Sequence, residues 1–140
     1  MLLSRSSEYA VQALLYIAKS SDKMVLAKEI SDRQSLALPF LGKILLSLVK
    51  GGLLKSRKGR GGGFSLAVPP DEITLIQVVH IIDGQDAFEG CVFGLPQCGA
   101  ENPCPVHDLW MDTRDQISEI FEHRTLAQLL DLVSPRISTD

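Results

Sequence analysis

The stretch from residue 39 to residue 68 most constrains the fold, because it joins a helical pattern to a strand pattern across glycine-rich turns. Its first half carries apolar residues at helical spacing, namely Leu41, Ile44, Leu45 and Leu48. We expect Gly51 and Gly52 to end this helix. Its second half alternates as a strand does, at Phe64, Leu66 and Val68. Two short strands flanking "KGRGG" therefore predict a β-hairpin with a basic tip.

Two further helices precede this unit. The segment "SSEYAVQALLYIAKS" has apolar residues at helical spacing and predicts a helix over about residues 7–20, and "LAKEISDRQ" predicts a short second one. Helix, short helix, turn, helix and hairpin is the order of a winged helix-turn-helix. The predicted fold class is mainly α with a small β-hairpin wing, and residues 1–85 form its DNA-binding part.

Residues 86–140 are expected to hold a cysteine-containing loop, a long helix and a short terminal helix, and to complete one compact domain. The long helix is predicted to begin at Pro105, and about 20 residues would make it about 30 Å long. Trp110 and Phe121 share its apolar stripe with neighbours at helical spacing. A two-fold homodimer would bury that stripe, and packing within the chain is the alternative.

The charges are segregated along the chain. The net charge is −3, yet residues 33–60 contain seven basic and no acidic residues, whereas residues 101–140 contain eight acidic residues against three arginines. This separation favours a basic face for double-stranded DNA, with two solvated faces as the alternative. The candidate DNA-binding residues are Gln34, Pro39, Phe40, Lys43, Ser47, Lys50, Arg57, Lys58 and Arg60.

Several other classes of protein have little support. No nucleophile and base stand in a recognisable arrangement, so we expect no enzyme. No apolar run reaches the roughly 18 residues of a membrane span, and no signal peptide opens the chain. The odd number of cysteines, three, argues against a secreted disulfide framework. We therefore expect a cytoplasmic protein without a membrane partner.

All three cysteines lie in one stretch, "CVFGLPQCGAENPCPVH", with the spacing Cys91-x6-Cys98-x5-Cys104 and His107 three residues later. Thiolates are soft ligands that suit iron–sulfur clusters, zinc or copper(I). Three thiolates leave one ligand position of a cluster vacant, and His107 can fill it from a helical face shared with Cys104. Structural zinc ligands usually lie closer together, two to four residues apart. A zinc site and three reduced thiols remain the alternatives.

These features together resemble the IscR/NsrR-type family of winged-helix transcription regulators over nearly the whole chain. The resemblance rests on "EYAVQAL", "ISDRQ", "LVKGGLLKSRKGRGGGFSL" and the three-cysteine loop before "LW". It implies a homodimer that binds a DNA operator and carries one iron–sulfur cluster per subunit, 2Fe–2S in preference to 4Fe–4S. It also implies cluster ligation by Cys91, Cys98 and Cys104, with either His107 or Glu8 of the partner subunit as fourth ligand.

One part of the chain departs from the family pattern. Family members tend to carry polar or acidic side chains early in the recognition helix, where this chain has Pro39, Phe40 and Lys43. Base readout is therefore expected from Lys43, Ser47 and Gln34, and family operator preferences do not transfer. The alternative functions are a zinc- or thiol-switched winged-helix regulator and a small iron–sulfur electron-transfer or carrier protein.

Overall fold

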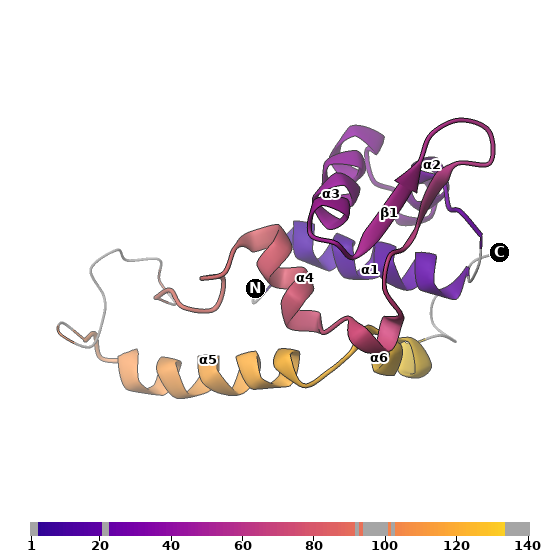
Figure 1. The fold of residues 1–140 in the computed structure, drawn as a ribbon. Coiled ribbons are helices and arrows are strands. Elements are labelled where there is room, and N and C mark those ends of the chain that lie inside the picture. Colours follow the sequence, from indigo (N-terminus) through magenta and orange to yellow (C-terminus); the bar gives the residue numbers. More distant parts are fainter. Residues whose placement is uncertain (1–2, 21–22, 92, 94–100, 102, 134–140) are drawn as a thin grey trace.

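The computed structural model describes residues 3–20, 23–91, 93, 101 and 103–133 (Figure 1). The elements in chain order are α1 (Arg5–Lys19), α2 (Ala27–Gln34), α3 (Leu38–Lys50), β1 (Leu54–Arg57), β2 (Gly63–Leu66), the 3₁₀-helix η1 (Pro70–Glu72), α4 (Leu75–Asp83), α5 (His107–Glu122) and α6 (Leu126–Val133). This order confirms the predicted fold class, mainly helical with one two-stranded antiparallel hairpin.

Helix α1 forms the centre of the core. Its buried face includes Ala10, Ala13, Leu14 and Ile17, each at most 1% exposed. The buried stripe of α3, at Leu41, Ile44, Leu45 and Leu48, was predicted from the sequence and belongs to the same core cluster. Burial of these side chains supplies most of the favourable free energy of folding. The core therefore fixes α3 against α1 and leaves the opposite side of α3 to solvent.

The turn between α2 and α3 has a distinct backbone conformation. Ser35 ends α2 in the left-handed region, with φ 52° and ψ 44°, which non-glycine residues seldom adopt. The Ser31 hydroxyl donates a hydrogen bond to the Leu36 carbonyl, and the Leu36 N–H donates to the Ser31 carbonyl over 3.1 Å. These bonds satisfy backbone groups at the end of α2 and set the direction in which α3 begins.

The wing is a four-residue antiparallel pairing in which Leu54 faces Leu66 and Arg57 faces Gly63. Gly63 has φ +134°, and a Cβ there would lie 2.5 Å from the Val25 carbonyl oxygen. The next residue, Phe64, exchanges two backbone hydrogen bonds of 2.8 Å with Val25. Glycine at position 63 is therefore required for the segment before α2 to pair with the wing.

The second strand is shorter than predicted, because β2 ends at Leu66 and does not include Val68. The Ala67 N–H donates to the Leu53 carbonyl over 2.9 Å. Pro69 and Pro70 follow, and they have no N–H to continue a ladder. The chain instead enters η1.

The segment from α4 to α6 folds back on itself, so that the start of α6 lies beside the start of α4. Thr74 and Gln77 at the start of α4, and Thr125 and Gln128 at the start of α6, form the reciprocal hydrogen bonds of two capping boxes. An antiparallel bridge joins Thr74 to Thr125. The chain therefore leaves α4, passes through the cysteine loop and α5, and returns to the position where α4 began (Figure 1).

The predicted start of the long helix at Pro105 is wrong, because α5 begins at His107. Pro105 and Val106 lie in a turn that precedes the helix. The His107 N–H donates to the Cys104 carbonyl over 3.0 Å. Cys104 therefore precedes α5 and does not share a helical face with His107. The hydrogen-bonded turn nevertheless keeps the backbones of the two residues close together.

Candidate functional site

The outward side of α3 presents most of the predicted DNA-binding residues. Pro39, Phe40, Lys43 and Lys50 are exposed, and Ser47 is half-buried. The Ser47 hydroxyl donates to the Lys43 carbonyl over 3.0 Å. The Phe40 ring meets the Tyr9 ring edge-on, with centroids 6.1 Å apart. Phe40 therefore anchors the start of α3 against α1, while the lysines extend into solvent.

Gln34 lies at the end of α2 and faces α1. Its Nε2 donates to the Tyr9 carbonyl over 3.4 Å and to the Gln12 Oε1 over 3.5 Å. Its own Oε1 is buried and has no hydrogen-bond partner among the described residues. This geometry makes Gln34 a link between α2 and α1 in the free chain; its predicted contact with DNA stays a prediction.

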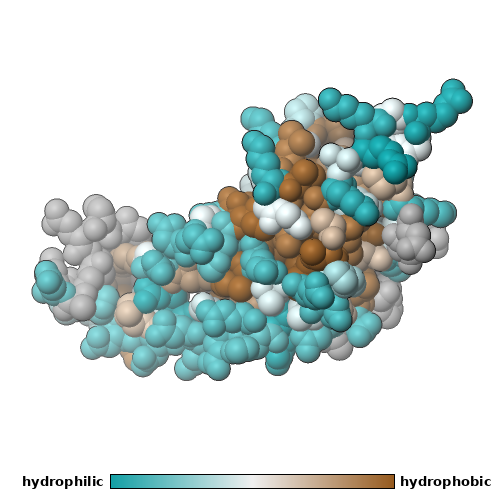
Figure 2. Space-filling view, in the orientation of Figure 1, coloured by the Kyte–Doolittle hydropathy of each residue, from teal (hydrophilic) through white to brown (hydrophobic). Residues whose placement is uncertain are grey.

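The three wing cations predicted to bind DNA, Arg57, Lys58 and Arg60, are exposed, and Lys55 of β1 is exposed as well. Within the part of the chain that the structure describes, the one ion pair joins Arg114 to Asp115 over 3.8 Å, so these cations have no acidic partner there. Figure 2 shows hydrophilic side chains extending from the wing tip at the upper right, and hydrophobic side chains gathered where α1, α3 and the wing meet. The wing and the outward side of α3 thus form one cationic end of the molecule.

The structure shows part of the predicted cysteine site. Cys91 and Cys104 are of intermediate burial and are not joined to each other by a disulfide, whereas Cys98 lies outside the described residues. His107 is half-buried at the first position of α5, and Glu8 is half-buried in the first turn of α1. Among described residues, which omit Cys98, no three His, Cys, Asp or Glu side chains come together as a metal site.

Residues 88–91, which we call the strap, run along α5 toward its N-terminal end. The Trp110 indole N–H donates to the Gly90 carbonyl over 2.9 Å. The Arg114 Nη1 donates to the Glu89 carbonyl over 2.7 Å. These bonds connect α5 to the residues immediately before Cys91. Sequence reasoning missed both, although the spacing of His107, Trp110 and Arg114 along one side of a helix was a usable signal.

The apolar stripe predicted for the long helix is divided between two environments. Phe121 packs edge-on against Phe88, with centroids 5.4 Å apart, and Trp110 contacts the strap. For these two residues packing within the chain is observed. Leu109 and Ile120 remain 73% and 56% exposed, and no residue of α5 is buried.

A second cluster, also missed from sequence, connects α1 to the end of α4. Asp83 is the last residue of α4, and its Oδ2 accepts a hydrogen bond of 2.7 Å from the hydroxyl of fully buried Ser7. The Ser4 hydroxyl donates to both Asp83 carboxylate oxygens, over 2.8 and 2.7 Å. This Ser4–Ser7–Asp83 cluster fixes the point at which the chain leaves α4 for the cysteine loop.

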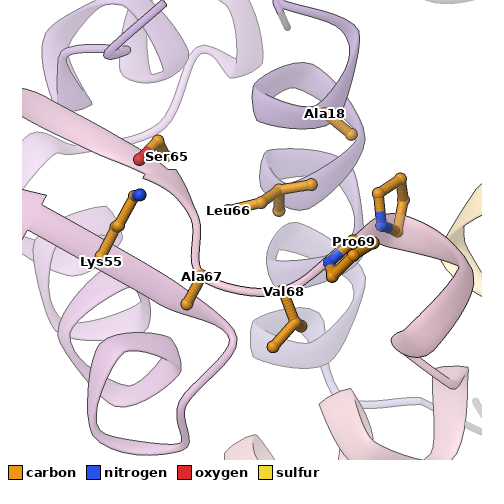
Figure 3. Close-up of a pocket in the computed structure, with 8 residues that line it drawn as sticks. Ala18, Lys55, Ser65, Leu66, Ala67, Val68 and Pro69 are labelled. Atoms are coloured by element: carbon orange, nitrogen blue, oxygen red, sulfur yellow. The ribbon is translucent and has the colours of Figure 1, made fainter. Parts of the chain in front are cut away.

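A cavity of about 510 Å³ lies at the base of the wing, away from the cysteines (Figure 3). Its lining consists of Ala18, Lys55, Ser65, Leu66, Ala67, Val68, Pro69 and Pro70. None of the residues predicted from sequence to bind DNA or a cluster belongs to that lining. The cavity is therefore separate from the candidate site.

Comparison with known proteins decides the family. The Rrf2 family, described as "Iron-dependent Transcriptional regulator", matches residues 3–132. The chain belongs to the Rrf2 family. A putative HTH-type transcriptional regulator of Aquifex aeolicus is 35% identical over 134 residues, which cover 94% of this chain and 93% of the relative. The HTH-type transcriptional regulator IscR of Aliivibrio salmonicida is 33% identical over 131 residues, 93% of this chain and 77% of the relative.

Solved structures have the same fold. IscR of T. potens matches with a TM-score of 0.75 and 26% identity, covering 97% of this chain and 90% of that one. CymR of B. subtilis matches with a TM-score of 0.76 at 24% identity, covering 93% and 96%, and this likeness concerns the fold alone. The resemblance read from the sequence is thereby confirmed. As an Rrf2 protein, the chain is a transcription regulator of a DNA-binding family, and its relatives confirm the prediction that it is not an enzyme.

No helix in the described part of this Rrf2 chain is long and apolar enough to cross a membrane.

Proposed function

We propose that this Rrf2 protein is a cytoplasmic, dimeric transcription regulator whose operator affinity is controlled by an iron–sulfur cluster bound in the cysteine loop. The observation that carries the proposal is the position of two half-buried cysteines. Cys91 and Cys104 both lie in the loop between α4 and α5, with Cys104 three residues before the first residue of α5. Along the chain, that loop follows the helices and wing that carry the cationic residues and precedes α5, whose apolar side is exposed. A ligand bound there can act on both.

In this proposal the cationic end reads the operator. The outward side of α3 enters the major groove, where Lys43 and Ser47 contact base edges and Lys50 contacts phosphate. Pro39 and Phe40 lie at the entry of α3, and Gln34 lies beside them at the end of α2.

The wing supplies the remaining contacts. Arg57, Lys58 and Arg60 are exposed, and we propose that they contact phosphates and the adjacent minor groove. Neutralising a phosphate releases counterions, so each such contact makes binding more dependent on salt.

The donor set of the loop fits an iron–sulfur cluster. Cys91 and Cys104 are half-buried, and thiolate sulfur is the ligand such clusters prefer. We assign Cys91, Cys98 and Cys104 as ligands, with His107 as the fourth and Glu8 of the partner subunit as the alternative. We favour 2Fe–2S, with 4Fe–4S as the alternative. When bound, the cluster would supply a redox-active centre that responds to iron supply, oxygen or nitric oxide.

The exposed apolar side of α5 is proposed as the dimer contact. Leu109 and Ile120 are three helical turns apart and far more exposed than apolar side chains in a core. Pairing two such helices about a two-fold axis would cover them and direct two α3 helices at the half-sites of a palindrome. Ligation of the loop then controls DNA affinity by restraining α5 relative to α4.

The test combines spectroscopy and DNA binding. Protein purified without air should be coloured, with iron and sulfide bound, and Cys98→Ser should lose both. On a DNA fragment selected from a random-sequence pool, Cys98→Ser should then bind alike before and after cluster reconstitution. A colourless, zinc-containing wild type would point to the zinc-switched alternative instead. Comparing spectra of His107→Ala and Glu8→Ala identifies the fourth ligand, because only its loss alters the cluster absorption.

A further inference from the structure

The strap and α5 run antiparallel, and their contacts follow one another in order. Phe88 meets Phe121, the Glu89 carbonyl meets Arg114, and the Gly90 carbonyl meets Trp110. Each step forward in the strap is a step back along α5, toward its first residue. Cys91 is the next residue of the strap, and the contacts direct it toward the N-terminal turn of α5, where His107 lies.

The two hydrogen bonds are made by side chains well suited to hold a backbone. The Arg114 side chain is 15% exposed, and its guanidinium donates a short hydrogen bond of 2.7 Å to the Glu89 carbonyl. A hydrogen bond from a charged donor is stronger than one between neutral groups. Trp110 is half-buried, and its indole N–H is a donor without acceptor capacity. The strap is therefore fixed to α5 by the protein's own side chains.

We propose that Trp110 and Arg114 are positioning residues that hold Cys91 at the N-terminal end of α5 before any cluster binds, and that they transmit occupancy of the cysteine loop to the dimer side of α5. The second half of this inference rests on the proposed function. Leu109 adjoins Trp110 in sequence, and its side chain lies on the exposed side of the helix. A shift of the strap that moves Trp110 would therefore also move Leu109.

The first arm of the test uses the full-length, cluster-free protein. Arg114→Met keeps an unbranched apolar stem but removes the guanidinium donors, and Trp110→Phe keeps a ring but removes the N–H. Each thiol is alkylated with iodoacetamide and quantified by peptide mass spectrometry, with Cys104 as internal reference. Loss of one net hydrogen bond should raise the Cys91 to Cys104 rate ratio by about 2- to 10-fold. The matched control is Arg124→Met, because the Arg124 guanidinium donates to the carbonyl of its own neighbour, His123, and not to the strap.

A second readout comes from fluorescence, because Trp110 is the single tryptophan of the chain. Arg114→Met should shift its emission to the red as the strap loosens, and Arg124→Met should leave it unchanged. Far-UV circular dichroism establishes that each variant is folded. An unchanged alkylation ratio in folded Arg114→Met and Trp110→Phe would overturn the positioning role.

The second arm measures loss of iron from reconstituted protein in the presence of a chelator. Faster loss from Arg114→Met than from Arg124→Met supports the link to the cluster, and equal rates contradict it. If the wild type binds no iron, the proposed function fails and with it the transmission step. The alkylation ratio of the cluster-free protein would still decide whether Trp110 and Arg114 position Cys91.

Discussion

The Ser4–Ser7–Asp83 cluster allows the sharpest prediction about stability. Asp83→Ala removes the carboxylate that accepts the Ser7 hydroxyl over 2.7 Å, and Ser7 is 0% exposed. A buried hydroxyl left without its acceptor costs about 1–3 kcal/mol. Ser4 is near solvent and regains water, so we expect a total loss of about 2 kcal/mol. For a chain of this size, that corresponds to a melting temperature lower by about 8 °C.

The reciprocal substitution should cost less. Ser7→Ala removes the buried hydroxyl itself, and the exposed Asp83 carboxylate regains water, so only the net worth of the bond is lost, about 1 kcal/mol. Asp83→Ala made in the Ser7→Ala background then leaves no buried donor without a partner. We expect the two substitutions to be coupled by about 1–2 kcal/mol in a double-mutant cycle.

Urea denaturation at one fixed protein concentration measures this coupling, since the concentration must be constant for a chain that associates. Asp83→Asn is the matched control, because it keeps an acceptor oxygen at the same place. The reasoning would be refuted by an Asp83→Ala cost that is the same, within about 0.5 kcal/mol, in the wild-type and Ser7→Ala backgrounds.

Two further perturbations test the wing and the DNA interface. Gly63→Ala should destabilise the chain by about 3 kcal/mol, because φ is +134° there and a Cβ would clash with the backbone. The control Gly42→Ala has open space around it and should stabilise α3 by up to about 1 kcal/mol. Thermal unfolding distinguishes the two variants, and equal effects would contradict the wing geometry. Lys58→Ala should weaken DNA binding and flatten the dependence of log affinity on log salt by about 0.9 for each phosphate no longer neutralised. The charge-matched Arg124→Ala should leave that slope unchanged, and an equal fall in both would point to a general loss of positive charge.

Local chemistry explains why much of the fold was predictable. The capping boxes at Thr74 and Thr125 are reciprocal bonds between residues three apart, so the sequence pattern contains both partners. The buried stripe of α3 is likewise a matter of helical spacing. The start of α5 was misjudged because Pro105 is well suited to a first helical turn, but a separate turn through Val106 precedes the helix.

Pairings between distant residues account for what the sequence did not reveal. Ser7 and Asp83 are 76 positions apart, and Trp110 and Gly90 are 20 apart. No local pattern identifies such partners, because they meet only when α1, α4 and α5 pack. The cysteine spacing predicts a metal or cluster site, because thiolates are soft ligands gathered here in one short loop, and the cluster stays a prediction. The fourth ligand remained open because His107 and Glu8 both carry suitable donors.

Operator affinity of cluster-loaded against cluster-free protein is the most direct test of control by the cysteine loop. Both forms are prepared from one anaerobic batch, iron and sulfide are quantified, and Kd is measured on the selected DNA fragment at one salt concentration. Coupling between a ligand and a distant site is typically about 1–3 kcal/mol, so we predict that Kd differs at least about 5-fold between the two forms. Equal Kd values, with the cluster verified in one form and absent from the other, would contradict control of DNA binding by the cluster.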